Sequence, residues 1–583
     1  NASPSASTDT RSFPSSRTSQ KNFGQALPTP AADALLRFAA LQPEQRLLVA
    51  PLFQKVTKPA RQVLRLRPQS LVQGPNRSGQ FPGRRPLRIH HHLQMPFQLF
   101  HARALSFPHP PRQARKTPSF FPFPLPFVFL SPMSRTIVIG AGLCGLVAAR
   151  ASRQNGVETL LLEAADQPGG VIRSRRVEGY LLEDGPNTLA LRAGGCLDYL
   201  KKTGLLSRAV DANPEANKRY LVRNGRLATA PASPPALLRT PLLSLAGKLR
   251  LLLEPLLPRG KNREHESVAA FFRRRLGREA LDYAANPFIA GVYAARPETL
   301  VLRHAFPTLH ELETEHRSLL LGGIRAAKRR KRERLPKTRL VSFPEGLAEL
   351  PRFLAEELGD SLLLQTSVRK VSRKESGWSL TYERKGETHQ IDAERILCAV
   401  PAHALDAIQW ENLDERDSLP LLAGAPHHPV AILHHGFRAE DIGHPLDGFG
   451  FLVPEKENLR ILGTLFSSTL FPGRAPEGHA LLTTFVGGER QPDLARSDDS
   501  ALHDLALDDL RHLLDLKAPP AFRHVVRWPQ AIPLPDSGQD ARLAAADKLV
   551  AANPGLSFTG SHLTGAALPA CMQGAANIPV PHG

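Results

Sequence analysis

Cysteine is scarce in this chain of 583 residues, which has only four. None of the four belongs to a C-x-x-C pair, and no histidine cluster lies near them at metal-binding spacing. This pattern predicts neither a disulfide framework nor a zinc site, and it suits a reducing compartment. We expect no metal site, and we interpret the histidine runs at 90–92, 427–428 and 434–435 as exposed polar residues. The cysteines are Cys144, Cys196, Cys398 and Cys571.

Acidic residues are nearly absent from residues 1–132, which contain three acids against 18 lysines and arginines. The same stretch holds 20 of the 53 prolines of the chain. It therefore carries most of the formal net charge of +21. Residues 133–583 are close to charge balance, so the basic composition argues for no nucleic-acid partner of the folded part.

Residues 1–132 also lack the pattern of a hydrophobic core, and we expect no stable domain there. Three interpretations stay open: a translated upstream region with Met133 as the true start, an organellar transit segment, and a disordered tail with a role of its own. Transit segments are typically rich in Arg and Ser and poor in acids. Phe120–Leu130 is too short and too rich in proline to span a membrane.

The strongest signal of the sequence lies in residues 136–163. The apolar, β-branched run Thr136–Ile139 predicts a buried strand, and Thr159–Leu162 predicts a second one. An alanine-rich segment between them, Leu146–Gln154, has helical spacing. Glycines at 140, 142 and 145 form G-x-G-x-x-G between the first strand and the helix.

These glycines and the acid that follows fit a dinucleotide. Gly140 permits the tight turn, Gly142 lets the backbone approach a pyrophosphate, and Gly145 lets the helix pack on the strand. The N-terminus of the helix attracts the phosphate charge. Glu163 lies 18 residues after Gly145, where an acid accepts hydrogen bonds from a ribose. The alternative is a glycine-rich turn in another kind of βαβ unit.

Two further segments connect this βαβ unit to flavin proteins. Gly169 and Gly170, followed by Arg173, suit a second pass of the backbone along the dinucleotide, and an arginine meets phosphate charge. The arrangement resembles the flavin-dependent amine oxidase and desaturase superfamily, which favours FAD. Residues 184–188, Asp-Gly-Pro-Asn-Thr, narrow the resemblance to the protoporphyrinogen oxidase family.

The resemblance to this family continues in order along nearly all of residues 133–575. No single motif decides the family, but their collinearity does. The similar segments are Asn217–Tyr220, His265–Phe272, Asn286–Tyr293, Leu446–Pro454, Leu462–Pro476, Phe485–Gly488, Trp528–Pro533 and Gly560–Gly565.

The family implies an α/β (α+β) fold. It combines a Rossmann-like FAD-binding domain of the amine-oxidase and p-hydroxybenzoate-hydroxylase type with an antiparallel-sheet substrate domain and a helical membrane-binding domain. The FAD-binding domain is expected in three parts, 133–220, 336–410 and 525–583. The helical domain is expected at 221–335, the substrate domain at 411–524, and a disordered or mistranslated extension at 1–132. The expected elements include helices at 347–358 and Asp498–Leu514, and strands within Leu362–Val371, Trp378–Glu383 and Glu394–Val400.

The expected cofactor is FAD, and its contacts come from the motifs above together with Val368, which is expected beside the adenine. The expected FAD-binding residues are Gly140, Ala141, Gly142, Leu143, Cys144, Gly145, Glu163, Ala164, Gly170, Arg173, Gly185, Pro186, Asn187, Thr188, Val368, Trp528, Gly560, Ser561, Thr564, Gly565 and Ala566.

The substrate that the family implies is a large, flat, apolar macrocycle with anionic propionates. Arg219 is the candidate partner of a propionate, because a guanidinium grips a carboxylate bidentately. Val430, Leu446 and Phe466 are expected to sandwich the pyrroles. Phe288 and Gly291 are expected to leave open space beside the flavin ring. The expected substrate-binding residues are Arg219, Asn187, Phe288, Gly291, Val430, Leu446 and Phe466. No catalytic side chain is assigned, because the cofactor supplies the difficult chemistry.

The implied activity is the six-electron, FAD-dependent oxidation of protoporphyrinogen IX to protoporphyrin IX in heme biosynthesis, with O2 as acceptor and H2O2 as product. One alternative is the oxidation of coproporphyrinogen III to coproporphyrin III. Another is an inactive flavoprotein or a misread frame. The expected partners are a porphyrinogen, O2, a membrane surface and a second copy of the chain as a homodimer. The expected location is the cytoplasmic face of the inner membrane or the cytoplasm, or an organellar membrane in a eukaryote.

Four segments of the sequence bear on the membrane contact and on the retention of FAD. Leu237–Leu257 is amphipathic and suits either a helix in a membrane interface or an ordinary buried helical domain, and Lys328–Arg334 is either a solvated loop or a contact with anionic lipid. Pro569 stands where the family has a backbone donor, and residues 577–583 cannot continue the expected long final helix. Pro569 is expected to remove or remake one contact with the flavin, and the missing helix is expected to weaken FAD retention.

Overall fold

The computed structural model describes residues 135–192, 194–260 and 264–579. These residues belong to one compact unit within Leu130–Gly583. The predictions for residues 1–132 and for Met133 lie outside the described residues.

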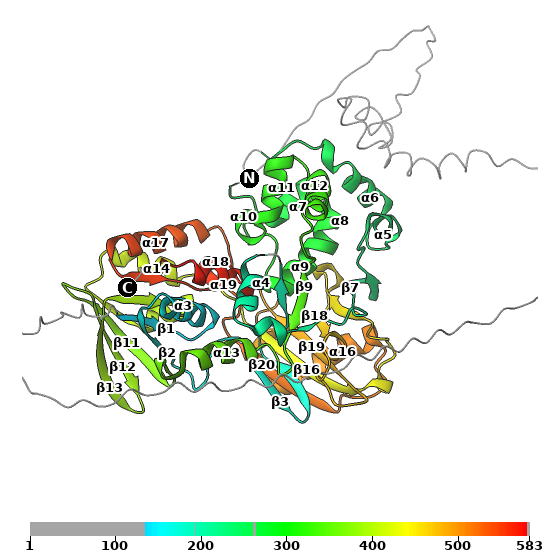
Figure 1. The fold of residues 1–583 in the computed structure, drawn as a ribbon. Helices are drawn as coiled ribbons and strands as arrows, with labels where there is room; N and C mark the ends of the chain where they lie inside the picture. The colour runs from blue at the N-terminus through cyan, green and yellow to red at the C-terminus, as the bar shows by residue number, and fades with distance from the viewer. Residues whose placement is uncertain (1–134, 193, 261–263, 580–583) are drawn as a thin grey trace, which may run out of the picture. The chain divides into compact units, whose positions relative to one another are not determined.

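A five-stranded parallel sheet is assembled from segments that lie far apart in the chain (Figure 1). Its order is β10-β2-β1-β14-β21, and all four pairings are parallel. The three aliphatic residues of β1 are at most 4% exposed, so the predicted buried strand is confirmed. Because the strands are parallel, their carboxyl ends meet at one edge, where open α/β sheets bind ligands. The strands are β1 (Arg135–Ile139), β2 (Glu158–Leu162), β10 (Leu362–Leu363), β14 (Arg395–Cys398) and β21 (Leu556–Phe558).

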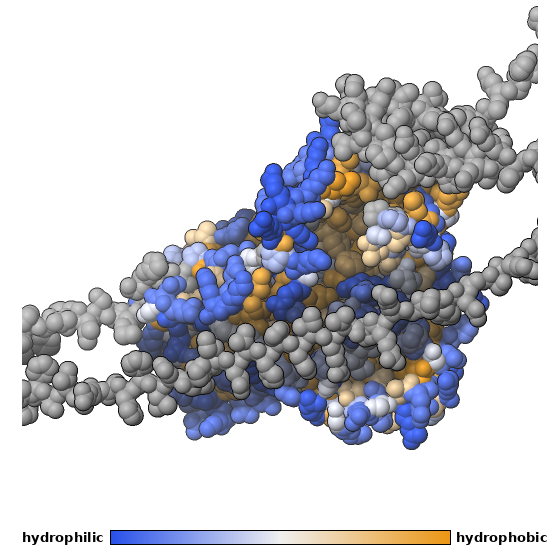
Figure 2. All heavy atoms as spheres, turned by 45° about the vertical axis from the view of Figure 1, so that its right-hand side comes forward, coloured by the Kyte–Doolittle hydropathy of each residue, from blue (hydrophilic) through white to orange (hydrophobic). Residues whose placement is uncertain are grey.

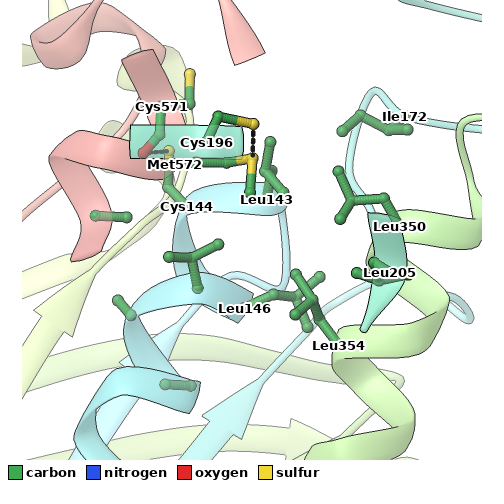
Figure 3. Packing of buried hydrophobic residues seen from close by; sticks show 14 of the residues in the cluster. Leu143, Cys144, Leu146, Ile172, Cys196, Leu205, Leu350, Leu354, Cys571 and Met572 are labelled. Atoms are coloured by element: carbon green, nitrogen blue, oxygen red, sulfur yellow. Dashed lines mark hydrogen bonds between the residues drawn. The ribbon is translucent and has the colours of Figure 1, made fainter. Parts of the chain in front are cut away.

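Helix α3 (Leu143–Gln154) connects β1 to β2 and begins three residues before the predicted helix. Figure 3 shows its packing: Leu146 faces Leu354 of α13 (Glu349–Leu358), and Cys144 lies beside Met572 of α19 (Leu568–Ala576). The N-terminus of α3 is therefore enclosed by helices from distant parts of the chain. The further helices of this region are α4 (Gly195–Lys202), α14 (Leu419–Ala423), α17 (Gln539–Ala552) and α18 (Ser561–Thr564).

Three smaller sheets accompany the parallel sheet. In the four-stranded one, β11, β12 and β13 are antiparallel neighbours and β15 pairs with β11 in parallel. The strands expected at 362–371, 378–383 and 394–400 are thus present as β10 with β11, β12 and β14. The strands are β3 (Ser174–Val177) with β4 (Tyr180–Glu183); β5 (Leu189–Leu191), β9 (Arg339–Ser342) and β6 (Val210–Asp211); and β11 (Thr366–Arg373), β12 (Trp378–Arg384), β13 (Glu387–Ala393) and β15 (Gln409–Glu411).

A seven-stranded sheet of order β20-β16-β19-β18-β17-β7-β8 forms the second large layer. Only β17 and β7 pair in parallel. The predicted domain boundaries at 220 and 524 fall inside β7 and β20, because long-range strand pairing places both strands in this sheet. The strands are β7 (Lys218–Arg223), β8 (Arg226–Thr229), β16 (Val430–Arg438), β17 (Gly448–Leu452), β18 (Ile461–Phe466), β19 (His479–Gly487) and β20 (Phe522–Trp528).

The two faces of this sheet pack against different helices. Along β16, Ala431 and Leu433 pack toward α16 (Asp499–Leu514), which is the helix expected at 498–514. Val430 and Ile432 pack toward Ala290 of α9 (Asn286–Tyr293). Alternate residues of a strand point to opposite faces, so these two clusters are separated by the sheet itself. The short helix α15 (Ser467–Leu470) follows β18.

The sequence prediction for His434 and His435 is wrong. Both side chains are fully buried in β16, where His435 Nε2 and His503 Nδ1 of α16 are 2.9 Å apart. His434 Nδ1 lies 3.2 Å from Thr483 Oγ1. The other residues of β16 up to Phe437 are apolar or glycine and buried, and pairing on both sides carries the two histidines into the interior.

The segment Leu237–Leu257 does not form one helix. Ser244 caps a second helix by accepting a hydrogen bond from Gly247 N, and prolines at 241 and 255 interrupt the helical backbone on either side. Lys328–Arg332 are the exposed last turns of a helix rather than a loop. Among the described residues, no helix is long and apolar enough to cross a bilayer. The helices of this region are α5 (Pro234–Arg239), α6 (Leu245–Leu252), α7 (Val268–Arg275), α8 (Arg278–Ala280), α10 (Leu302–Ala305), α11 (Pro307–His316) and α12 (Leu319–Arg332).

Candidate functional site

The glycine-rich loop at the carboxyl end of β1 has the geometry of a phosphate cradle. Gly140 has φ +97°, a conformation that L side chains rarely adopt. A Cβ on Gly145 would overlap the carbonyl oxygen of Gly140, whereas a Cβ on Gly142 would meet no atom within 4 Å. The N-terminus of α3 has no side-chain cap and no acid in its first turn, so no side chain of the helix competes for its N–H groups. This arrangement suits a pyrophosphate.

Glu163 lies against the glycine-rich loop. Its Oε2 accepts a hydrogen bond of 2.6 Å from Ala141 N, and its Oε1 accepts one of 2.9 Å from Ala165 N. Ala164 lies between Glu163 and Ala165 in the chain. The Glu163 carbonyl oxygen also accepts a hydrogen bond of 2.8 Å from Thr366 N. This last bond fixes the start of β11 beside Glu163. Val368, two residues further along β11, therefore lies near the carboxyl end of β2.

The second glycine pair passes directly against the first loop. Gly169 N donates a hydrogen bond of 2.8 Å to Ala141 O, and a Cβ on Gly170 would lie 3.4 Å from Gly142 Cα. Arg173 Nε donates to Gly170 O at 3.0 Å. The Arg173 guanidinium carbon lies 5.8 Å from the centroid of the Trp528 ring. The arginine and the tryptophan are therefore neighbours at the edge of the loop.

Residues 184–188 are tied to the same place. Trp528 Nε1 donates a hydrogen bond of 2.5 Å to Asp184 O. A Cβ on Gly185 would overlap the carbonyl oxygen of Val171, so only glycine fits there. Asn187 Nδ2 donates to Gly185 O at 3.0 Å, which holds the turn through Pro186 toward Thr188.

The closing segment reaches the N-terminus of α3 from the far end of the chain. Thr559 N donates to Cys398 O at 2.9 Å, which sets Gly560 and Ser561 at the carboxyl edge of the parallel sheet. Thr564 Oγ1 donates to Gly560 O at 3.1 Å. Gly565, which precedes Ala566, has φ +94°, and its carbonyl oxygen accepts a hydrogen bond of 3.2 Å from Cys571 Sγ.

The segments that the sequence predicted to bind FAD thus meet at one edge of the parallel sheet. Pro569 lies in the first turn of α19, where a backbone donor has no partner within the helix, so the helix forms and docks on α3. Cys144 Sγ contacts Cys571 O at 3.7 Å in this interface, close to the expected Leu143. The individual contacts of these residues with FAD stay predictions.

The structure does not bring together the three residues expected to sandwich the pyrroles. Val430 lies in the cluster beneath α9, next to Trp528. Leu446 and Phe466 lie in the cluster on the opposite face of the seven-stranded sheet, and Phe466 is fully buried there. Sequence spacing could not show which face each strand residue takes.

Helix α9 carries the other two apolar candidates. The expected open space at Gly291 is filled, because a Cβ there would lie 2.5 Å from Leu452 Cδ2. Glycine at this position therefore lets α9 approach β17 closely. Phe288 is 49% exposed one turn earlier on the same helix, and its ring lies 6.0 Å from that of Phe306.

Arg219 is an exposed cation at the end of the seven-stranded sheet. Its guanidinium carbon lies 4.9 Å from the centroid of the Phe449 ring, and Nη1 donates to Asn217 O at 3.1 Å. Within the described part of the chain it forms no ion pair, whereas the neighbouring Lys218 is paired with Asp447. Arg219 therefore keeps donors for an external carboxylate, with an aromatic ring beside it.

Sequence reasoning missed a small cavity of about 10 Å³ beside Asn187. Glu183 and Arg474 line it and form an ion pair with 2.9 Å between Nη1 and Oε1. Burial raises the pKa of Glu183 to about 7, although the arginine opposes this shift. Burial also lowers the pKa of Arg474. An acid directly before Asp-Gly-Pro-Asn was the one available signal, but nothing in the sequence pairs it with Arg474.

Comparisons with known proteins show the family of the chain. The profile of the family "Flavin containing amine oxidoreductase" matches residues 143–577. The mitochondrial protoporphyrinogen oxidase of Nicotiana tabacum is 33% identical over 75% of this chain and 92% of its own length. The coproporphyrinogen III oxidase of Bacillus subtilis is 27% identical over 76% of this chain and 96% of its own length.

Solved structures share the fold. A crystal structure of a provisionally named protoporphyrinogen oxidase from Exiguobacterium sp. 255-15 superposes with a TM-score of 0.64 at 22% identity. The match covers 76% of this chain and 97% of that one. The chain therefore belongs to the flavin-containing amine oxidoreductase family, as an FAD-dependent oxidoreductase related to the protoporphyrinogen oxidases.

Proposed function

We propose that this protein oxidises protoporphyrinogen IX to protoporphyrin IX with O2 as the acceptor. The observation that carries the substrate assignment is Arg219, an exposed guanidinium beside the Phe449 ring that forms no ion pair within the described residues. An arginine next to an aromatic surface suits a flat macrocycle that ends in a carboxylate. The relation to a protoporphyrinogen oxidase over most of both chains supports the same substrate.

We call the carboxyl edge of the parallel sheet the nucleotide edge; it comprises residues 140–145, 163–173, 184–188 and 559–566. These residues would hold the cofactor. Bound FAD supplies the hydride acceptor for a saturated bridge carbon and the centre at which O2 is reduced. The N-terminus of α3 would bind the pyrophosphate, and Glu163 would bind the ribose. Arg173 and Trp528 would close the edge of the site, since they lie beside Gly170 and Asp184. Arg219 would orient the substrate through its propionate.

Coproporphyrinogen III is the second candidate substrate, because one relative is a coproporphyrinogen III oxidase. This substrate has four carboxylates rather than two and requires more cations at its site. The cation next to Arg219 is Lys218, and it is already paired with Asp447. This pairing favours the substrate with two carboxylates.

Porphyrin formation tests the proposal. The full chain, loaded with FAD, should convert protoporphyrinogen IX into a fluorescent porphyrin faster than the same protein without FAD. Coproporphyrinogen III should be converted more slowly under matched conditions. Equal rates with and without FAD would contradict the proposal. A protein that folds but retains no flavin would favour the inactive alternative.

We further propose that the helical region rests on a membrane surface. Seven exposed large apolar side chains lie between residues 238 and 335, and Figure 2 shows apolar surface gathered between hydrophilic margins on one face. Leu245 is 83% exposed, and the basic end of α12 offers charge for anionic lipid. Co-sedimentation with anionic liposomes should fall in Leu245→Glu, and undiminished co-sedimentation would contradict this placement. The compartment and the homodimer stay predictions.

A further inference from the structure

The buried ion pair between Glu183 and Arg474 joins two parts of the molecule that carry predicted site residues. Glu183 ends β4, on the side of the nucleotide site, and Arg474 follows α15 in the seven-stranded layer. Their side chains are 5% and 3% exposed. Water cannot satisfy charges at this depth, so the pair persists only if the protein fills their remaining hydrogen-bonding positions.

The protein fills the positions around Glu183. Ser174 Oγ donates to Oε2 at 2.5 Å, and Leu347 N donates to Oε1 at 3.0 Å. The turn before Leu347 contains Gly346 with φ +88°, and a Cβ there would lie 3.0 Å from Glu183 Oε1. The backbone is therefore wrapped closely around this carboxylate, which receives donors from three separate segments.

Arg474 is held on its side of the pair through Nη2, whereas among the described residues Nη1 forms only the ion pair with Glu183 and no hydrogen bond. Its Nη2 donates to Ser342 Oγ of β9 at 2.6 Å, and its carbonyl oxygen accepts a hydrogen bond of 3.0 Å from Leu181 N of β4. The guanidinium carbon lies 5.4 Å from the centroid of the Phe471 ring. The arginine is therefore held by contacts with β9, β4 and Phe471.

The residues that line the cavity show which chain segments meet at the ion pair. Asn187 lines it from the segment that follows Glu183, and Ser467 lines it from the segment that follows Phe466. Ser467 Oγ lies 2.8 Å from Thr483 Oγ1, which anchors that wall to β19. The ion pair therefore joins the segment that carries Asn187 to the chain between α15 and β19 in the seven-stranded layer.

We propose that Glu183 and Arg474 are positioning residues for porphyrinogen oxidation, which set the Asn187 segment against the seven-stranded sheet. This inference rests on the proposed function. A misplacement of reacting groups by about 1 Å slows a reaction by about a hundredfold. Substrate affinity should change less than turnover, because neither residue of the pair forms an ion pair with Arg219, although Phe471 beside Arg474 clusters with Phe449 beside Arg219. The pair should therefore control kcat more than KM.

The test compares three changes in the full, FAD-loaded chain. Arg474→Met leaves Glu183 buried without its partner, and we expect kcat to fall at least about tenfold with KM within about threefold. Arg474→Lys keeps the charge and should recover part of kcat. The double variant Glu183→Leu with Arg474→Met removes both charges and should regain the melting temperature, since paired apolar replacements are often neutral, but not kcat.

Arg176 provides the matched control. It pairs with Glu345 at 3.0 Å and also donates to Gly473 O, so it joins the same two parts of the molecule at the surface. Its side chain and that of Glu345 are 44% and 55% exposed. Arg176→Gln should leave kcat, KM and the melting temperature unchanged.

Recovery of kcat together with the melting temperature in the double variant would overturn the proposal, because the pair would then serve stability alone. A loss confined to KM or to flavin occupancy would also overturn it. If Arg474→Met fails to fold, the double variant decides. Wild-type protein that binds FAD and oxidises neither porphyrinogen would refute the proposed function. The pair is then judged by the visible circular dichroism of bound flavin, which should change in the double variant and not in Arg176→Gln.

Discussion

The nucleotide edge and the seven-stranded sheet differ in how far their geometry is encoded locally. The turn from β1 to α3 needs only the spacing of three glycines within one short stretch, and Gly140 and Gly145 each have a steric reason in the structure. The sheet takes its strands from residues 218–229 and 430–528, so its surface depends on pairings between distant segments. Changes at the nucleotide edge should therefore act through cofactor binding, and changes on the sheet through the substrate.

The largest effect is expected at Gly145. A Cβ there would overlap the Gly140 carbonyl oxygen, which is backbone and cannot yield. Gly145→Ala should therefore abolish flavin retention and lower the melting temperature. Gly142→Ala is the control, because a Cβ at Gly142 meets no protein atom. It should melt like the wild type but bind FAD more weakly. Flavin absorbance and thermal unfolding separate the two, and a normally flavinated Gly145→Ala protein would contradict the assignment.

Arg219→Ala should lower kcat/KM for protoporphyrinogen IX by about ten- to a hundredfold, since a hydrogen bond to a charged group contributes about 1.5–3 kcal/mol. FAD content should stay unchanged, because Arg219 lies on β7 outside the nucleotide edge. Arg219→Lys should recover only part, as it keeps the charge without the planar fork. Arg226→Ala, on the neighbouring strand β8, should behave like the wild type. Loss of flavin in Arg219→Ala would show that this residue belongs to the other region.

Glu163→Ala should weaken FAD binding by about tenfold without unfolding the protein, because it removes a carboxylate that bonds the glycine-rich loop at 2.6 Å. The dissociation constant of FAD is the measurement, with kcat at saturating FAD close to that of the wild type. Asp166→Ala, an exposed acid three residues later, is the control and should change neither value. An unaltered FAD affinity in Glu163→Ala would remove the acid from the cofactor site.

The smallest effect concerns pH and the buried histidines of β16. Burial lowers the pKa of His434 to about 3 and holds that of His435 well below its usual value. Both stay neutral when folded, while an unfolded histidine takes a proton near pH 6.5. The contribution of each histidine to the free energy of unfolding is therefore fully present above pH 6.5. Below that pH it falls by about 1.4 kcal/mol for each pH unit. Glu183, whose raised pKa acts in the opposite sense, offsets part of this loss.

Thermal unfolding between pH 7.5 and 5 checks this dependence. His435→Phe should make the melting temperature less sensitive to acid, and the exposed His512→Gln should leave the dependence as in the wild type. An equal acid sensitivity in all three proteins would contradict the account of β16.

The sequence predicted most of the nucleotide edge because its determinants are local. The buried strand, the glycine turn, the helix and Glu163 follow from spacing within residues 136–163, and only the start of α3 differed. The strand β16 was harder to predict, since two histidines inside an apolar run resemble a polar surface. Their burial follows from strands on both sides of β16, which no local pattern shows.

The substrate side was predicted in parts. Arg219 is exposed and free of acidic partners within the described residues, and its role stays a prediction, but Val430 and Phe466 lie on opposite faces of the sheet. A one-residue change of register reverses the face of a strand residue, and register depends on distant pairing. The Glu183–Arg474 pair escaped for the same reason, because its two residues are neighbours only in the folded chain.

Oxygen uptake by the purified, FAD-loaded chain tests the central claim most directly. Protoporphyrinogen IX should drive rapid O2 consumption with H2O2 formed in step with the porphyrin, and coproporphyrinogen III should drive it more slowly. A flavin-loaded protein that consumes no O2 with either porphyrinogen would contradict the account.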